Sequence, residues 1–366
     1  MNIYTERKNQ LVALMKEEGI KAVMLSPSMN MYYLTGFNTF PGERLLVSIL
    51  TDDGELIFIA PKMYEQEVKE KAQFDSILAW DDSQDPCALV RRTAGDKGLN
   101  NGRLAIEDTM WFNNFNKLFK SIEGASYIEA SEIIGKMRMR KSKEEVDLLR
   151  NSSRLADKSL QGIVKHIKPG MKETQIKELL EAEMKNNGLD MPSFDTIIGS
   201  GSNSALPHYT AGERVLQEGD SVVIDFGGVA HGYVSDMTRT FMLGKASDEY
   251  RKVYEILKAA QQKAIEAVRP GVKANSVDAA ARSYIAAHGY GEYFIHRTGH
   301  GVGLEVHEMP YITDRNELIL EPGMAFSIEP GIYLPGKFGM RIEDLVVVTA
   351  DGVEVLNTFS KELMEL

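Results

Sequence analysis

Residues 216–227 read Leu-Gln-Glu-Gly-Asp-Ser-Val-Val-Ile-Asp-Phe-Gly, and residues 320–331 read Leu-Glu-Pro-Gly-Met-Ala-Phe-Ser-Ile-Glu-Pro-Gly. The two stretches align without a gap, which places Asp225 opposite Glu329 at the end of an apolar run. A carboxylate at the end of a buried strand is costly to desolvate unless a partner compensates for its charge. Because both halves of the chain carry such an acid, we expect the two acids to face one shared cation site.

The repeat extends upstream of these strands. Residues 167–172 match residues 268–273, and each match contains a Pro-Gly pair. Apolar residues at helical spacing follow each match and lead to a glycine, Gly188 or Gly289, which is typical of a helix C-terminus. Each half is therefore predicted to fold as a helix, a Pro-Gly turn, a second helix and then strands that end in an acid.

Composition and charge limit the class of protein. With 366 residues, 43% of them hydrophobic and 26% charged, the chain has a globular balance and enough length for two domains. Its net charge of -11 repels nucleic acid and anionic membranes. We therefore expect neither of them as a partner.

Cysteine usage and the N-terminal sequence bear on the compartment. Cys87 is the single cysteine, which excludes an internal disulfide framework and a zinc site built from cysteines. Residues 1–8 lack the apolar core of a signal peptide, and no stretch approaches the length of a membrane span. The sequence thus predicts a soluble, cytoplasmic protein.

The chain is predicted to divide near its only concentrated basic run, residues 136–143. Before this run, a helix near residues 5–18 and several short strands predict a small mixed α/β domain. Ser142 and Glu145 form a capping-box pattern, so a new helix should begin near residue 143. We interpret the basic run as a linker or a solvated helix start. The predicted parts are an N-terminal domain for substrate access or dimerisation, a linker and a catalytic domain, with bounds 1–135, 136–142 and 143–366.

Four carboxylates are predicted to converge. Asp225 is followed by Asp236 across a glycine-rich reversal, and Glu329 is followed by Glu343 across a similar loop. Four acids in one place would raise one another's pKa unless a counter-ion were present. Two divalent cations about 3.5–4 Å apart, bridged by carboxylates, remove this conflict. We therefore predict a dinuclear metal site.

One imidazole ligand should complete this site. Four of the seven histidines lie between residues 288 and 307, and His300 among them is flanked by two glycines that leave room for an ion near the backbone. His300 is therefore the predicted nitrogen ligand. His307 is the next candidate for a role in the site.

These motifs resemble those of the pita-bread metallopeptidases, and most closely those of the Xaa-Pro peptidases, the prolidases and proline aminopeptidases. The stretches that carry the resemblance are GSGSNSALPHY at 199–209, DFGG at 225–228, SDMTRT at 235–240, HRTGHGVGLEVHE at 296–308, IEPGIY at 328–333 and MRIED at 340–344. Residues 30–37, NMYYLTGF, are similar to the N-terminal domain of that family. The resemblance thus covers essentially the whole chain, and six ordered motifs make it specific.

The resemblance implies an α/β fold in which a pita-bread catalytic domain with pseudo-two-fold symmetry follows a smaller creatinase/prolidase-type domain. It implies that the metal ligands are Asp225, Asp236, His300, Glu329 and Glu343. It also implies that His208 and His307 line the substrate site, that Arg341 lies nearby, and that the protein is a homodimer.

The expected chemistry is hydrolysis of an Xaa-Pro bond by a hydroxide that two divalent metal ions generate. His307 is expected to donate a hydrogen bond to the oxyanion, and Glu329 to relay a proton to the leaving amine. His208 is expected to contact the proline. Mostly carboxylate ligands suit manganese first, with cobalt or zinc as alternatives.

Several alternatives remain open at this point. Arg315 is a candidate clamp for the free carboxylate of a dipeptide, and together with the compact length it favours a dipeptidase over a proline aminopeptidase. A methionine aminopeptidase would share the ligands but would not need the N-terminal domain. A creatinase-like amidinohydrolase and a non-catalytic peptide-binding module would share the fold, but such proteins lack the ligand set present here.

Overall fold

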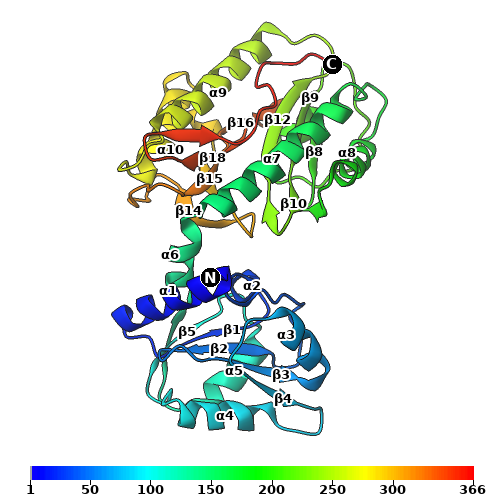
Figure 1. Ribbon diagram of the computed structural model, residues 1–366. Helices are drawn as coiled ribbons and strands as arrows, with labels where there is room; N and C mark the ends of the chain where they lie inside the picture. The colour runs from blue at the N-terminus through cyan, green and yellow to red at the C-terminus, as the bar shows by residue number, and fades with distance from the viewer. Residues whose placement is uncertain (1) are drawn as a thin grey trace. The chain divides into compact units, whose positions relative to one another are not determined.

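A computed structural model describes residues 2–366 of the chain (Figure 1). The chain separates between Met137 and Arg138 into two compact units, each of which is described by itself. Helix α6 (Ile134–Met139) contains this boundary.

The first unit is a mixed six-stranded sheet with helices around it. Its helices are α1 (Ile3–Glu18), α2 (Met29–Thr35), α3 (Glu65–Lys71), α4 (Pro86–Asp96) and α5 (Phe112–Ser121). Its strands are β1 (Ala22–Leu25), β2 (Val47–Thr51), β3 (Leu56–Pro61), β4 (Ser76–Trp80), β5 (Arg103–Ile106) and β6 (Ser126–Glu129). They are ordered β4-β3-β2-β1-β5-β6, with β2 antiparallel to both of its neighbours.

Local signals in the first unit account for some of its elements. Helix α1 ends at Gly19, which has a φ of 67° and donates its backbone N–H to the carbonyls of the last turn. Strands β2 and β3 pair as a hairpin around Gly54, where the sequence Asp52-Asp53-Gly54 is typical of a hairpin turn. The predicted small α/β domain is confirmed.

The second unit contains the duplicated halves. The first half comprises α7 (Lys143–Val164), α8 (Glu173–Asn187), β7 (Met191–Pro192), β8 (Ile197–Ser200), β9 (Ser221–Phe226), β10 (Gly228–Ala230), β11 (Tyr233–Val234) and β12 (Met237–Met242). The second half comprises α9 (Asp248–Ala267), α10 (Ala274–Ala287), β13 (Gly299–Gly301), β14 (Glu308–Ile312), β15 (Ala325–Ile328), β16 (Gly331–Leu334), β17 (Phe338–Arg341), β18 (Asp344–Val348) and β19 (Val353–Val355).

The helices of this unit begin and end where the sequence indicated. Ser142 caps α7 in a full capping box with Glu145. Gly188 adopts a φ of 99° after α8, and Gly289 adopts a φ of 87° just beyond α10. Residues without a side chain tolerate this left-handed conformation best, which explains why glycine stands at both ends.

The two halves use the same strand arrangement. Strand β9 pairs antiparallel with β12, and the short strands β10 and β11 lie between them in the sequence. In the same way β15 pairs antiparallel with β18, and the hairpin of β16 and β17 lies between them. The predicted internal repeat of strands that end in an acid is therefore confirmed.

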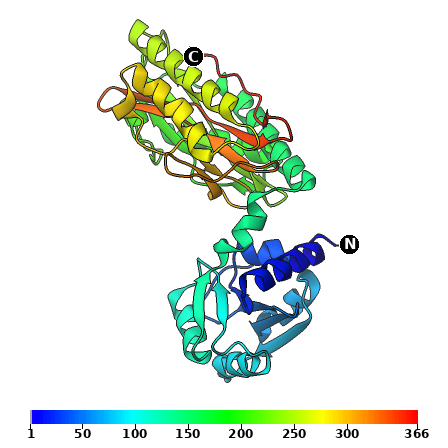
Figure 2. The same cartoon turned by 90° about the vertical axis from the view of Figure 1, so that its left-hand side faces the viewer.

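The helices of each half bury an apolar face against that half's own strands. Figure 2 shows α9 and α10 running side by side along the strands of the second half. Leu160, Ile176 and Ile224 belong to one buried cluster, and Leu257 and Phe326 belong to the other. Burial of these side chains supplies the main stabilisation of the fold. It also holds the acid-bearing strand ends in fixed positions.

One expectation about the basic run is wrong. Arg138 and Lys141 are not solvated: each is 7% exposed, although Arg140 between them is exposed. Buried cations require nearby anions, and both side chains pair with the buried carboxylate of Glu308. Spacing along the run could not reveal a partner that lies so far away in the sequence.

None of the helices within residues 2–366 has the combination of length and hydropathy that crossing a bilayer requires.

Candidate metal centre and substrate pocket

The hairpins of the two halves present four acids at their ends. Asp225 lies near the end of β9, and Asp236 immediately precedes β12. In the second half Glu329 follows β15, and Glu343 immediately precedes β18. His300 is the central residue of the short strand β13, which pairs with β15. The repeat thus brings equivalent strand ends together around one imidazole.

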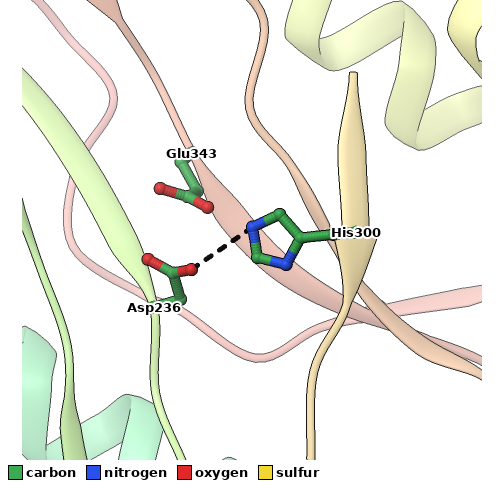
Figure 3. Close-up of side chains that lie close together, drawn as sticks. All are labelled: Asp236, His300 and Glu343. Atoms are coloured by element: carbon green, nitrogen blue, oxygen red, sulfur yellow. Dashed lines mark ion pairs between the residues drawn. The ribbon is translucent and has the colours of Figure 1, made fainter. Parts of the chain in front are cut away.

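The five predicted ligands line one cavity of the second unit. Asp236, His300 and Glu343 each offer one atom within 4.8 Å of the others, and they point toward one another in Figure 3. The His300 Nε2 atom lies 3.1 Å from Glu329 Oε1 and 3.5 Å from Asp236 Oδ2. Such spacing allows one small cation to contact several of these atoms.

The electrostatics of the cluster call for a cation. Burial raises the pKa of Asp236 well above its usual range, and repulsion by Asp225 and Glu329 adds to this shift. Burial likewise raises the pKa of Glu343 well above its usual range, reinforced by Asp236, Glu329 and Asp225. Asp225 Oδ1 and Glu343 Oε1 are buried without a hydrogen-bond partner among the described residues. Buried acceptors of this kind fit metal ligands, because a divalent ion would satisfy them and neutralise the repulsion.

Glu329 behaves differently from the other acids. Burial alone would raise its pKa, but its contact with His300 outweighs burial and lowers the pKa to about 2. Ser327 supports this arrangement, since its hydroxyl donates to Glu329 at 3.2 Å and accepts the His300 backbone N–H at 3.1 Å. Glu329 is therefore ionised at neutral pH.

Arg341 is buried and bonded to the acid cluster. Its guanidinium donates to Asp225 Oδ2, to the Tyr333 hydroxyl at 2.6 Å and to the Thr238 hydroxyl at 3.1 Å. Although Arg341 also lines the cavity, these bonds occupy all three of its guanidinium nitrogens. Its contacts therefore orient Asp225, and its predicted role as a substrate contact stays a prediction.

The cavity has a volume of about 600 Å³, which suits a small peptide. Besides the four acids and the imidazole already named, its wall includes Ser193, Phe194, Ile197, Pro207, His208 and Val306. His307 and Arg297 also line the cavity. The structure thus brings both predicted substrate-site histidines to the cavity.

His307 stands directly beside the candidate metal centre. Its ring packs edge-on against the ring of His300, with centroids 4.2 Å apart and an interplanar angle of 89°. Partial burial, reinforced by the neighbouring His300, lowers the pKa of His307 to about 4. The imidazole is therefore neutral near pH 7, and one of its nitrogens carries a hydrogen that it can donate.

The loop that carries His208 is held by a buried acid that sequence reasoning missed. Glu173 is fully buried and accepts hydrogen bonds from the Ser200 backbone and hydroxyl, the Asn203 amide, the Tyr209 hydroxyl and the Gly212 backbone. These partners lie on both sides of His208 in the sequence. Glu173 follows a Pro-Gly turn at the start of α8, where an acid is ordinary for a solvated helix end, so only the fold could reveal its role.

Two arginines differ in their relation to the cavity. Arg297 lines it and stacks on the Tyr311 ring, 4.7 Å from the ring centroid. No carboxylate within residues 2–366 lies at ion-pair distance from Arg297. Arg315 is exposed and is not part of the cavity wall. Sequence reasoning selected Arg315 and overlooked Arg297, although Arg297 stands within the histidine-rich motif.

The chain matches two family models along most of its length. Residues 147–350 match metallopeptidase family M24, and residues 7–140 match the creatinase/prolidase N-terminal domain. The two matches follow one another in the order that the resemblance predicted.

Relatives of known name match over the whole chain. The Xaa-Pro dipeptidase of Pyrococcus furiosus is 35% identical over 98% of this chain and 99% of its own length. The crystal structure of a dipeptidase from Pyrococcus horikoshii superposes with a TM-score of 0.94, at 40% identity, covering 98% of this chain and 100% of that one. A prolidase from Thermococcus sibiricus gives a TM-score of 0.95 at 39% identity, with 100% of both chains covered.

These matches confirm the pita-bread fold, the creatinase/prolidase-type N-terminal domain and the prediction of an enzyme. They do not test which residues bind metal or substrate, so those roles stay predictions based on the geometry above. The chain belongs to metallopeptidase family M24.

Proposed function

We propose that this protein is an Xaa-Pro dipeptidase, which hydrolyses the peptide bond before proline in a dipeptide. The observation that carries the proposal is a cluster of four carboxylates, three of them buried and Glu329 largely buried, with one imidazole in the wall of a peptide-sized cavity. The relatives named as dipeptidases and prolidases support the choice of substrate.

We assign two divalent metal ions to Asp225, Asp236, His300, Glu329 and Glu343. The two buried orphan oxygens, on Asp225 and Glu343, support this assignment. When bound, such ions lower the pKa of water and so supply a nucleophile near neutral pH. A site with mostly oxygen ligands suits manganese, with cobalt or zinc as alternatives.

Glu329 is the proposed proton carrier of the reaction. Its carboxylate is ionised at neutral pH, because contact with His300 lowers its pKa, and such a weakly basic group readily passes on a proton that it receives. Hydrolysis releases the proline nitrogen as an amine, which must gain a proton as the bond breaks. Glu329 lines the cavity and can therefore serve both the incoming water and the departing nitrogen.

His307 is the proposed donor to the oxyanion. It lines the cavity next to His300 and is neutral near pH 7, so its N–H is available for a hydrogen bond. Loss of one such donor typically lowers kcat about 10²–10³-fold. His208 lies on a separate loop of the same wall, where we place the proline ring of the substrate.

Arg297 supports a preference for dipeptides. A dipeptide places its free carboxylate directly after the proline, whereas a longer peptide has an amide at that point. Since Arg297 lines the cavity and forms no ion pair within residues 2–366, it is available to bind this carboxylate. We therefore favour Arg297 over the exposed Arg315 as the clamp, and a role for Arg315 stays an untested prediction.

The N-terminal domain is proposed to restrict substrate length or to form a homodimer interface, as the family resemblance implies. The bounds 1–135, 136–142 and 143–366, the homodimer and the cytoplasmic location remain predictions.

Assaying purified protein, supplied with manganese, on Met-Pro tests the proposal. We expect hydrolysis by the wild type and none by Asp236→Ala or His300→Ala, while Asp82→Ala, an exposed acid of the first unit, retains full activity. Full activity of either site variant would reject the metal assignment. Binding of Met-Pro without hydrolysis would favour the non-catalytic module, and hydrolysis of creatine instead would favour the amidinohydrolase.

A further inference from the structure

We propose that Arg138 and Lys141 are positioning residues, which hold the loop of His307 in place through the buried carboxylate of Glu308. The inference deepens the proposed function and rests on it, because it explains how this chain fixes the proposed oxyanion donor. It also assigns a role to two residues of the basic run, which from the sequence alone is interpreted as a linker or a solvated helix start.

The contacts form a buried cluster of ion pairs. Glu308 directly follows His307, and its two carboxylate oxygens accept from Lys141 Nζ and Arg138 Nη2, each at 2.5 Å. Arg138 also pairs with Glu305 at 2.8 Å. One guanidinium therefore joins two acids that stand on either side of His307 in the sequence.

The charges in this cluster are compensated. Burial alone would raise the pKa of Glu308, but Lys141 and Arg138 outweigh burial and lower it. The side chain of Lys141 is 2% exposed and that of Glu308 is 8% exposed, so water screens the attraction only weakly. Well-packed apolar residues of the same volume often stabilise a fold as much as a buried ion pair does. We therefore attribute these buried ion pairs to fixing the position of the loop rather than to stabilising the fold.

Close packing restricts the same loop from its other side. A side chain at Gly303 would place its Cβ atom 2.4 Å from Glu308 Oε1. The Gly303 carbonyl accepts the Val234 backbone N–H at 3.0 Å, and Val234 lies two residues before Asp236. The loop is thus fixed between the ion cluster and the strand that leads to a proposed metal ligand.

The position of His307 depends on this support. Its ring contacts His300 edge-on, but its side chain is exposed toward the cavity. An oxyanion donor must stand within hydrogen-bond distance of the developing charge, and an error of about 1 Å can cost about 10²-fold in rate. Loosening the ion cluster should therefore lower kcat without changing the ligands of the metal.

The test compares two arginines of one run. Arg138→Met removes the charge and keeps an unbranched side chain, whereas Arg140→Met removes an exposed arginine that pairs with Glu321 at 2.6 Å. We expect Arg138→Met to lower kcat on Met-Pro about 10–100-fold, with KM and bound metal within about twofold of wild type. Arg140→Met should leave all three unchanged. Equal kcat values for the two variants would overturn the proposal.

A mutant cycle separates positioning from a general loss of structure. If Arg138 acts through His307, then Arg138→Met should lower kcat by less than about threefold in a His307→Ala background. If Arg138→Met lowers kcat by the same factor with and without His307, the proposal is overturned. Should Arg138→Met fold poorly, a second variant is Arg138→Lys, which keeps a cation beside Glu308 but lacks the guanidinium that joins Glu305 and Glu308, and it is compared with wild type in the same way.

A second readout does not depend on turnover. In metal-free protein labelled at histidine, we expect Arg138→Met to shift or broaden the imidazole signals of His307, while those of His296 stay unchanged. Unchanged His307 signals would overturn positioning. A wild type that does not hydrolyse Met-Pro would instead refute the proposed function, and the histidine signals would still decide the role of Arg138.

Discussion

The hydroxyl of Thr238 donates a hydrogen bond to Glu343 Oε2 at 2.7 Å and thereby joins the two duplicated halves. Thr238 lies opposite Asp225 in the register of β12 and β9, and its hydroxyl also accepts from Arg341 Nε at 3.1 Å. A single side chain in the first half thus orients an acid of the second half. Partners of this kind fix the direction of metal ligands and tune their affinity.

Thr238→Val should weaken metal binding while keeping the shape of the side chain. We expect the affinity for manganese to fall about 10–100-fold, because Glu343 loses the donor that orients it. Titration calorimetry on metal-free protein measures this change. Thr35→Val, which removes another buried hydroxyl but lies in the first unit, serves as the control. Equal affinities in the two variants would show that Thr238 does not orient the site.

Arg297→Ala should change the preference for substrate length. We expect kcat/KM on Met-Pro to fall about 10–100-fold, because the variant loses a charged contact to the free carboxylate. Activity on a tripeptide that extends Met-Pro by alanine should change little. Arg315→Ala is the matched control, since it removes the same charge from an exposed position outside the cavity wall. A larger loss in Arg315→Ala than in Arg297→Ala would return the clamp to Arg315.

Acid should destabilise the second unit in part through Glu308. Lys141 and Arg138 lower the pKa of Glu308 in the folded protein below the value of about 4.3 expected for an unfolded glutamate. The stabilisation is therefore present above about pH 4.3 and is lost as the pH falls through the folded-state pKa. Denaturant unfolding of metal-free protein between pH 7 and pH 3 should show a shallower loss of stability in Glu308→Gln than in wild type. An equal loss of stability with falling pH in wild type and Glu308→Gln would contradict this role of Glu308.

Arg239 should contribute strongly to stability without touching the cavity. Its buried side chain pairs with Asp344 at 2.7 Å and donates to the backbone carbonyls of Thr238 and Phe359 at 2.9 and 2.8 Å. Arg239→Ala should lower the free energy of unfolding by about 3–5 kcal/mol, because it leaves a buried carboxylate with one partner fewer. Arg150→Ala, which breaks a partly exposed ion pair with Glu354, should cost about 1 kcal/mol or less. Similar losses in the free energy of unfolding for Arg239→Ala and Arg150→Ala would contradict this prediction.

The sequence predicted those parts of the fold that depend on local signals. The capping box at Ser142, the glycine after α8 and the hairpin around Gly54 each involve residues within a few positions of one another. The internal repeat also relates residues that are distant in the sequence, because aligning the two halves places Asp225 and Glu329 at the ends of equivalent strands. These features explain why the architecture and the clustering of acids could be anticipated.

Other features depend on partners that are distant in the sequence. Arg138 pairs with Glu308, 170 positions away, and nothing in the basic run distinguishes this arginine from its exposed neighbour Arg140. Glu173 likewise looks like an ordinary acid at a helix start, although it collects hydrogen bonds from a whole loop. Burial of a charge is set by tertiary packing, so local patterns gave no sign of either role.

The number of divalent ions bound per chain tests the central claim most directly. We predict about two manganese ions per chain in wild-type protein after loading and dialysis, measured by elemental analysis. Asp225→Asn and Glu343→Gln should each retain about one ion or fewer, while Asp82→Asn retains the full number. A wild type that binds no ion, or site variants that bind as many ions as the wild type, would contradict the assignment of these side chains to a dinuclear centre.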